Sequence, residues 1–286
     1  MVNKWFSESL YPDIKLQLKV KKTLYSSNSS SQKVQFIETD RLGKILTLDG
    51  VIQTTTADEF IYHEMMAHVP LFSHPNPEQV LIIGGGDGGI LREVLKHKGI
   101  KKITLVEIEK KVIDCSKKYL KQICSNSFQS KKLELIITDG AEFIKNRTNL
   151  YDVAIIDSTD PVGPAKVLFE DKFNRNVSNI LKKNGIMVRQ SGSSFLQKDE
   201  LKENFNKSAK IFKHTSVYTA SIPTYIGGLF SLIFSSNTIN PNKFNKNTLK
   251  NRFAKLSLKT KYYNSEIHTA CFKLPNYIKN IIGEKL

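Results

Sequence analysis

Acidic side chains follow several apolar, strand-like segments of this chain. Asp87 lies in the glycine run after QVLIIG, Glu107 ends ITLVE, and Asp139 ends LELIITD. Asp157 ends YDVAIID, and Asp160 follows three residues later. In an open parallel sheet the carboxyl ends of the strands share one edge, where ligands bind. We therefore expect these five carboxylates to line one acidic pocket, suited to a cationic ligand.

The glycine run IIGGGDGGI contains the dinucleotide-binding pattern G-x-G-x-x-G at Gly84, Gly86 and Gly89, with Glu107 twenty residues beyond Asp87. Asp87 argues against a bound pyrophosphate, because like charges 4 Å apart repel by roughly 4 kcal/mol at an effective dielectric constant of 20. We predict a loop that binds a positively charged nucleoside without phosphates. Asp87 can also be interpreted as a helix N-cap, and the two roles are compatible.

The other acids have roles that fit a nucleoside and an amine. Glu107 is suited to accept hydrogen bonds from both ribose hydroxyls, and Asp139 from an adenine amino group, although each could equally be a local cap. Asp157 and Asp160 precede PVGP, whose prolines and glycine favour a stiff loop that closes over a ligand. The alternative for this pair is a turn stabilised by Asx hydrogen bonds.

Neither a metal site nor a serine nucleophile is predicted. HEMMAH places His63 and His68 five residues apart, roughly 140° around a helix, whereas H-E-x-x-H zinc sites need a spacing of four. Tyr62 and His63 are better interpreted as pocket-lining residues, and His68 as structural. The nucleophile pattern G-x-S-x-G is absent from the sequence.

The composition gives a formal net charge of +16, from 43 Lys and Arg against 27 Asp and Glu in 286 residues. The lysines are scattered, which favours a solvated basic surface over a nucleic-acid footprint. No apolar run is long enough to span a membrane, and the first residues lack a signal-peptide pattern. Three cysteines without metal-type spacing favour a reducing, cytoplasmic setting.

Two kinds of element are expected to position the acids. Residues 1–55 alternate apolar and polar residues, with turns at Asp40–Gly43 and Asp49–Gly50, and predict an N-terminal antiparallel β domain. Residues 56–286 alternate strand and helix patterns, which predicts an α/β domain with a mostly parallel sheet. The expected strands are 79–84, 101–108, 132–140, 151–158, 185–191, 214–223 and 229–236. The expected helices are 57–74, 89–99, 109–124, 141–147, 168–185 and 196–212.

From Trp5 to Tyr277 the chain closely resembles the spermidine synthases, the polyamine aminopropyltransferases. The segments that carry the resemblance are LTLDGVIQTTTADEFIYHEMMAHVPL, VLIIGGGDGGILREV, IIDSTDPVGPA and IPTYIGG. The resemblance implies a methyltransferase-like Rossmann domain behind the small β domain, in a homodimer or homotetramer. It implies transfer of the aminopropyl group of decarboxylated S-adenosylmethionine to putrescine, giving spermidine and methylthioadenosine, without a permanently bound cofactor.

The resemblance also implies roles for single residues. Those matching donor contacts are Gln32, Asp87, Glu107, Asp139, Gly140 and Pro164. Those matching contacts to the polyamine are Gln53, Tyr62, His63, Asp87, Asp157, Ser158, Thr159, Asp160 and Tyr225. Asp157 matches the catalytic proton acceptor. Ile226 and Gly192 depart from the pattern of many members near the amine, so the acceptor stays open among putrescine, cadaverine and longer polyamines.

Two rival functions use the same residues differently. A methyltransferase that uses S-adenosylmethionine would share the fold, but its pocket must hold the methionine carboxylate, which Asp87 and Asp157 would oppose. A nucleic-acid-binding protein would use the charge of +16, and its DNA affinity would depend steeply on salt. Both are less consistent with the acids than aminopropyl transfer is.

Overall fold

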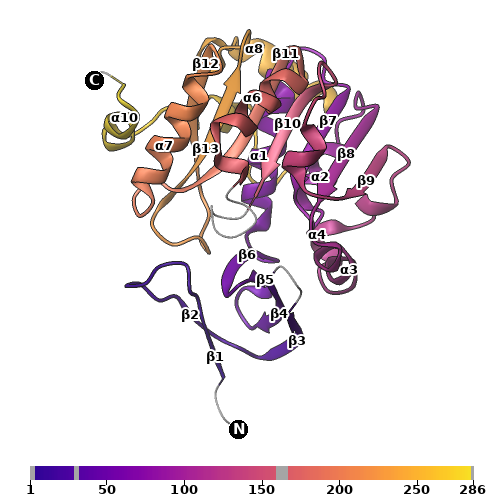
Figure 1. Ribbon diagram of the computed structural model, residues 1–286, viewed down its shortest axis with the longest axis vertical. Helices are drawn as coiled ribbons and strands as arrows, with labels where there is room; N and C mark the ends of the chain where they lie inside the picture. Colours follow the sequence, from indigo (N-terminus) through magenta and orange to yellow (C-terminus); the bar gives the residue numbers. More distant parts are fainter. Residues whose placement is uncertain (1–3, 29–31, 159–166, 285–286) are drawn as a thin grey trace.

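The N-terminal part of the chain forms two antiparallel sheets. The computed structural model describes residues 4–28, 32–158 and 167–284. Strands β1 (Trp5–Ser7) and β2 (Gln17–Lys19) pair with each other, and β3 (Lys22–Asn28), β4 (Lys33–Thr39), β5 (Gly43–Leu48) and β6 (Val51–Thr55) form a four-stranded sheet. Figure 1 shows these strands together at one end of the molecule, below the larger sheet.

The turn between β5 and β6 confirms the Asp-Gly prediction. Leu48 pairs with Val51, so Asp49 and Gly50 form a two-residue loop. Their φ angles are +49° and +81°, and a type I′ hairpin turn requires positive φ at both positions. Asparagine, aspartate and glycine tolerate this conformation best, which explains why Asp-Gly stands there.

The second part is built on a seven-stranded sheet in the order β12-β13-β11-β10-β7-β8-β9. The five strands β7 to β11 run parallel, and β13 is antiparallel to both β11 and β12. This is the predicted mostly parallel sheet, in a methyltransferase-like arrangement. The strands are β7 (Gln79–Gly84), β8 (Lys102–Glu107), β9 (Leu133–Ile137), β10 (Tyr151–Asp157), β11 (Leu181–Ser193), β12 (His214–Ser221) and β13 (Leu229–Ser236).

The strand order creates one switch point. From β7 the chain continues to β8 and β9 on one side, whereas β10 adds to the other side of β7. Ligands of such sheets bind in the crevice at the carboxyl ends of the two strands where the order reverses. Here those ends are Gly84 and Asp157, which are direct partners in the ladder.

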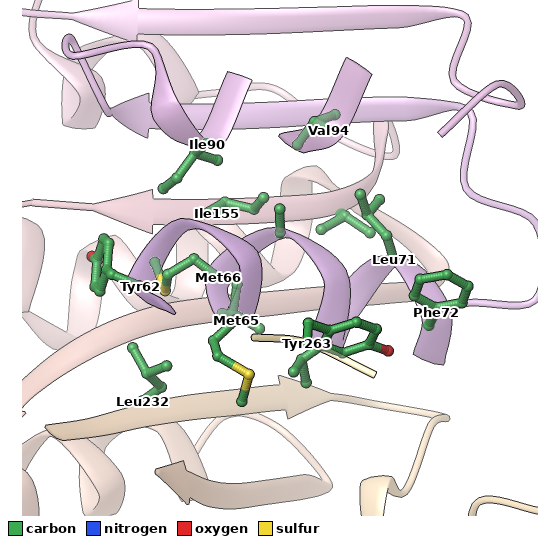
Figure 2. Packing of buried hydrophobic residues seen from close by; sticks show 14 of the residues in the cluster. Tyr62, Met65, Met66, Leu71, Phe72, Ile90, Val94, Ile155, Leu232 and Tyr263 are labelled. Atoms are coloured by element: carbon green, nitrogen blue, oxygen red, sulfur yellow. The ribbon is translucent and has the colours of Figure 1, made fainter. Parts of the chain in front are cut away.

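Helix α1 (Glu59–Ser73) packs against the large sheet and contributes many residues to the hydrophobic core beside it. Almost all of its residues are buried, as expected for a helix covered on every side. Figure 2 shows Met65 and Met66 of α1 between Ile155 of β10 and Leu232 of β13. The remaining helices are α2 (Gly89–Leu95), α3 (Lys110–Tyr119), α4 (Lys121–Cys124), α5 (Gly140–Ile144), α6 (Asp171–Ile180), α7 (Lys198–Ala209), α8 (Lys246–Leu256), α9 (Ser265–Ala270) and α10 (Asn276–Ile282).

Several helix predictions were wrong in extent or continuity; the helix expected over 89–99, for example, ends at Leu95. The helix expected over 168–185 ends at Ile180, because Leu181 pairs with Tyr151 and starts β11. Residues 182–185 then loop out of the ladder before pairing resumes. The helix expected over 109–124 is broken at Leu120, whose φ of −110° and ψ of 38° are not helical. Within the described ranges, no helix combines the length and apolarity that a membrane span requires.

Candidate active site

A pocket of about 360 Å³ lies at the switch point, between the N-terminal sheet and the ends of the parallel strands. It brings together eleven of the residues predicted from the sequence: Gln32, Gln53, Tyr62, His63, Asp87, Glu107, Asp139, Gly140, Asp157, Ser158 and Tyr225. The other three, Thr159, Asp160 and Pro164, lie outside the described residues.

The pocket is acidic although the chain is basic. Among its described lining residues are the carboxylates of Glu8, Asp49, Asp87, Glu107, Asp139 and Asp157, and none of these lining residues is a lysine or an arginine. The chain as a whole has a net charge of +16, so the described basic side chains lie outside this pocket. A cation is favoured in such a pocket, and a phosphate is repelled.

Asp157 is fixed at the end of β10 by a close approach to β7. Gly84 has φ +83°, and a Cβ there would lie 1.9 Å from the carbonyl oxygen of Asp157, so only glycine fits. The carboxylate accepts a hydrogen bond from Tyr62 Oη at 2.6 Å. Burial, followed by the negative charge of Asp87, raises the pKa of Asp157 to about 6. Asp157 is therefore a stronger base than an exposed aspartate.

His63 lies between two carboxylates. Its Nδ1 is 2.5 Å from Glu59 Oε2, and its Nε2 is 3.1 Å from Asp87 Oδ2. Burial alone would lower the pKa of His63, but Asp87 and Glu59 outweigh it and raise the pKa to about 10. Asp87 Oδ1 also accepts the Gly89 N–H at 2.8 Å. Asp87 lies one residue before the N-cap of α2, which is Gly88, so the N-cap interpretation was wrong, although Asp87 holds the first N–H of the helix. Asp87 also lines the pocket, and its role toward a cation stays a prediction.

Glu107 is held against the glycine loop. A Cβ at Gly86 would lie 2.8 Å from Glu107 Oε2, so the loop approaches the carboxylate closely because it has no side chain there. Glu107 Oε1 accepts the Glu109 N–H at 2.9 Å. Burial raises the pKa of Glu107 to about 7, against backbone hydrogen bonds that favour the charged form.

Glu107→Gln is expected to stabilise the protein at pH 8. Because the folded pKa is about 7 and the ordinary value 4.5, the ionised Glu107 costs stability above pH 7, and this cost disappears below pH 4.5. We expect a gain of about 1 to 2 kcal/mol at pH 8, a few degrees in Tm. Thermal melts at pH 8 and pH 5 test this, because an equal gain at both would contradict the cause.

Asp139 is confirmed as a helix cap. Its side chain accepts the Ala141 N–H at 2.6 Å and the Glu142 N–H at 3.3 Å at the start of α5. Its place in the pocket lining leaves a donor contact open, and that role stays a prediction. The cap orients the carboxylate two residues after β9, the neighbour of β8, which ends at Glu107.

Aromatic rings form one wall of the pocket. Tyr62 packs edge-on against Tyr225 and Phe230, with ring centroids 6.1 and 6.0 Å apart. Tyr225 Oη donates to the carbonyl oxygen of Gln53, which joins this wall to the N-terminal sheet. Such a wall suits the methylene carbons of an alkyl amine, with the carboxylates left for its charged ends.

Sequence reasoning missed several residues of the site. Glu8, Tyr11, Gln190 and Gln197 line the pocket. Gln190 Nε2 donates to the carbonyl oxygen of Ser158 at 3.1 Å. Glu59 was also missed, although its spacing of four residues before His63 on an expected helix was a signal for a pair. The residues near the N-terminus gave no local signal, because tertiary packing alone brings them to the pocket.

His68 is structural, as its spacing from His63 indicated. It is fully buried, and its ring nitrogens lie 2.9 Å from His97 Nε2 and 3.0 Å from Glu93 Oε2. In residues 4–28, 32–158 and 167–284, no group of three or more His, Cys, Asp or Glu side chains could hold a metal ion.

The sheet order and the acidic crevice at its switch point define a methyltransferase-like α/β protein with an acidic site. Residues 59–247 match the spermine/spermidine synthase domain, and residues 4–56 match the spermidine synthase tetramerisation domain. The chain belongs to the spermidine synthase family.

The similar proteins cover nearly the whole chain. A polyamine aminopropyltransferase of Caldicellulosiruptor saccharolyticus is 45% identical over 97% of this chain and 98% of its own length. Polyamine aminopropyltransferase 1 of Bacillus cereus is 42% identical over the same shares. A spermidine synthase solved with the transition-state analogue AdoDATO has a TM-score of 0.94, 40% identity, and coverage of 99% of this chain and 96% of that one. The spermidine synthase of Thermotoga maritima has a TM-score of 0.92 at 38% identity, covering 100% and 96%.

Proposed function

We propose that this enzyme transfers the aminopropyl group of decarboxylated S-adenosylmethionine to putrescine, giving spermidine and methylthioadenosine. The observation that carries the proposal is the acidic pocket at the switch point, whose described lining contains no lysine or arginine. The donor carries a sulfonium and an ammonium but no carboxylate, and the acceptor is a diamine. Every charged group of both substrates is therefore attracted by this pocket.

The donor's nucleoside lies along the parallel strand ends in this proposal. Glu107 accepts hydrogen bonds from the ribose hydroxyls, and Asp139 and Gly140 contact the adenine. Gln32 contacts the nucleoside from the N-terminal part of the chain. Asp87 attracts the ammonium of the aminopropyl arm. The placement of all these residues in one pocket supports these roles.

Asp157 removes the proton that blocks the acceptor. An alkyl ammonium has a pKa of roughly 10.4, so its lone pair is occupied at neutral pH. Raising the pKa of Asp157 from 3.8 to about 6 lowers the cost of accepting that proton by roughly 3 kcal/mol. The freed nitrogen attacks the aminopropyl carbon, the carbon–sulfur bond breaks, and its electron pair neutralises the sulfonium. Alignment of the three atoms supplies further rate.

Tyr62, Gln53 and Tyr225 place the acceptor in this scheme, whereas His63 acts through Asp87, because both of its ring nitrogens face carboxylates. Burial, and then the charge of Asp157, raise the pKa of Tyr62 well above its ordinary value, so the phenol keeps its proton and orients Asp157 as a donor. The roles of Ser158, Thr159, Asp160 and Pro164 beside the acceptor remain predictions from the resemblance.

The proposal extends to the state of the protein. The match of residues 4–56 to a tetramerisation domain supports a homo-oligomer, and we infer a homotetramer. The buried thiols of Cys115, Cys124 and Cys271 are consistent with a cytoplasmic setting.

One assay tests the proposed reaction. The purified protein is incubated with decarboxylated S-adenosylmethionine and, separately, putrescine, cadaverine or spermidine, and the release of methylthioadenosine is measured. Putrescine is expected to give the highest kcat/KM. S-adenosylmethionine with a panel of methyl acceptors is the control for the methyltransferase alternative. Methyl transfer without aminopropyl transfer would contradict the proposal.

The pH dependence tests the role of Asp157. Since the base must be ionised, kcat/KM should fall below pH 6, the value to which the pKa of Asp157 is raised. The hydrogen bond from Tyr62 lowers that pKa, so Tyr62→Phe should move the acid limb to higher pH. Profiles of both proteins from pH 5 to 9 measure this. An acid limb that stays in place in Tyr62→Phe would assign it to another group, such as Glu107.

A further inference from the structure

Four side chains of alternating charge lead away from the pocket, three of them buried and the fourth, Arg92, partly exposed. Asp87 borders the pocket, His63 contacts Asp87, Glu59 contacts His63, and Arg92 contacts Glu59. Glu59 and His63 lie one turn apart on α1, and Asp87 and Arg92 flank the first turn of α2. The outer pair, Glu59 and Arg92, is absent from the proposed contacts to either substrate.

The geometry fits a doubly protonated imidazole. A neutral imidazole has one N–H donor, but both ring nitrogens of His63 face carboxylate oxygens, at 2.5 and 3.1 Å. Only the imidazolium donates to both. The ring is also fixed in place, because a Cβ at Gly89 would lie 2.2 Å from its atoms. His63 thus has a single orientation, set by its two carboxylates.

Arg92 fixes the carboxylate behind the ring. Its Nη1 and Nη2 donate to Glu59 Oε1 and Oε2 at 3.0 and 2.9 Å, a bidentate pair. The fork itself is held, since Nε donates to Glu93 at 2.8 Å and Nη1 to the Ile123 carbonyl oxygen at 2.6 Å. Glu59 therefore cannot rotate away from His63 without breaking these bonds.

Other titratable groups surround this row of charges. Four further titratable groups interact with members of this row. They are Tyr62, Glu93, Cys124 and Asp157. Of the charged groups described there, Glu59 and Asp87 alone lie within ion-pair distance of the His63 ring.

We propose that Glu59 and Arg92 are positioning residues that keep His63 doubly protonated, so that its Nε2–H fixes the Asp87 carboxylate in the direction of the donor's ammonium. The proposal rests on the proposed function for the identity of the donor. The effect on the His63 ring does not depend on it. Without the negative charge of Glu59, the imidazolium loses one of its two stabilising carboxylates.

The decisive variant is Glu59→Gln, followed by NMR of the histidine ring nitrogens. His63 in the unaltered protein should keep both ring protons through pH 9, because its pKa is raised to about 10. In Glu59→Gln it should titrate near pH 8, since an opposite charge at this range shifts a pKa by about 1 to 3. Glu203→Gln is the matched control, as Glu203 is exposed on α7 and also has a cation four residues away, Lys207 at 2.6 Å.

Kinetics give a second readout. The ratio of donor kcat/KM between Glu59→Gln and the unaltered protein should fall about tenfold from pH 6.5 to pH 9, as His63 loses its charge in the variant alone. Glu203→Gln should keep a constant ratio of one. Taking the ratio cancels the ionisation of the acceptor, which is common to all the proteins.

Two outcomes overturn the inference: a doubly protonated His63 at pH 9 in Glu59→Gln, or a kinetic ratio that does not change with pH. If Glu59→Gln fails to fold, Arg92→Lys is the second variant. It keeps the positive charge but loses the bidentate pair with Glu59. It should lower the pKa of His63 and the kinetic ratio in the same direction, by smaller amounts. Absence of aminopropyl transfer in the unaltered protein would reject the proposed function, whereas the NMR titration would still decide the positioning of His63.

Discussion

Asp157→Asn should lower kcat by about three orders of magnitude while the donor still binds. The amide cannot take a proton from the acceptor ammonium, and positioned general bases contribute about 10² to 10⁴ in rate. The donor's main contacts in the proposed complex come from Asp87, Glu107 and Asp139, which the substitution leaves in place. Single-turnover rates and isothermal titration with the donor measure the two effects separately.

A second aspartate of the same strand provides the control. Asp152 accepts the N–H groups of Glu78 and Gln79 at 3.0 and 2.8 Å and pairs with Lys182 at 3.0 Å. Burial opposes its charge, but these partners lower the pKa of Asp152, so Asp152→Asn should reduce Tm and leave turnover per folded molecule unchanged. Asp157→Asn should show the opposite, with Tm kept or raised at pH 8. Near-normal turnover of Asp157→Asn would remove this residue from the base role.

Asp87→Asn should lower kcat/KM for the donor about 100-fold. The variant loses the charge that attracts the aminopropyl ammonium, and two unit charges 4 Å apart attract by roughly 4 kcal/mol at an effective dielectric constant of 20. A 100-fold loss corresponds to about 2.7 kcal/mol. This is less than the full attraction, because solvent replaces part of the lost interaction with the ammonium. Initial rates at saturating putrescine measure the effect.

Methylthioadenosine distinguishes this cause from a general disturbance of the pocket. The product keeps the nucleoside but lacks the ammonium arm, so its Kd should change less than threefold in Asp87→Asn. If the donor and the product lost affinity equally, Asp87 would act through the glycine loop, where its Oδ1 accepts the Gly89 N–H.

Local patterns were sufficient for most of the fold. The period-two segments and Asp-Gly turns of the N-terminal part, and the apolar runs of β7 to β11, depend on interactions between near neighbours. The ends of helices and strands were harder to predict. Leu181 leaves the helical pattern because it pairs with Tyr151 thirty residues away, and Leu120 interrupts an otherwise regular helix. No nearby residue signals either event.

The residues of the site also differ in whether local sequence or long-range packing reveals them. Acids at strand ends could be found, because a parallel sheet places all such ends together. Glu59 and Arg92 could not, since their pairing depends on how α1 packs against α2. Glu8 and Tyr11 reach the pocket only through the docking of the N-terminal sheet. Long-range packing of this kind leaves no periodic trace in the sequence.

Gln32 and Gln53 come from the part of the chain that matches a tetramerisation domain, yet they line the same pocket as Asp157. A substrate that touches both parts binds fully only while the N-terminal sheet is docked, and by mass action it must hold the sheet there. Occupied enzyme should therefore resist limited proteolysis in this region. Conversely, a compound that wedges the sheet away would inhibit the enzyme without resembling either a nucleoside or a polyamine.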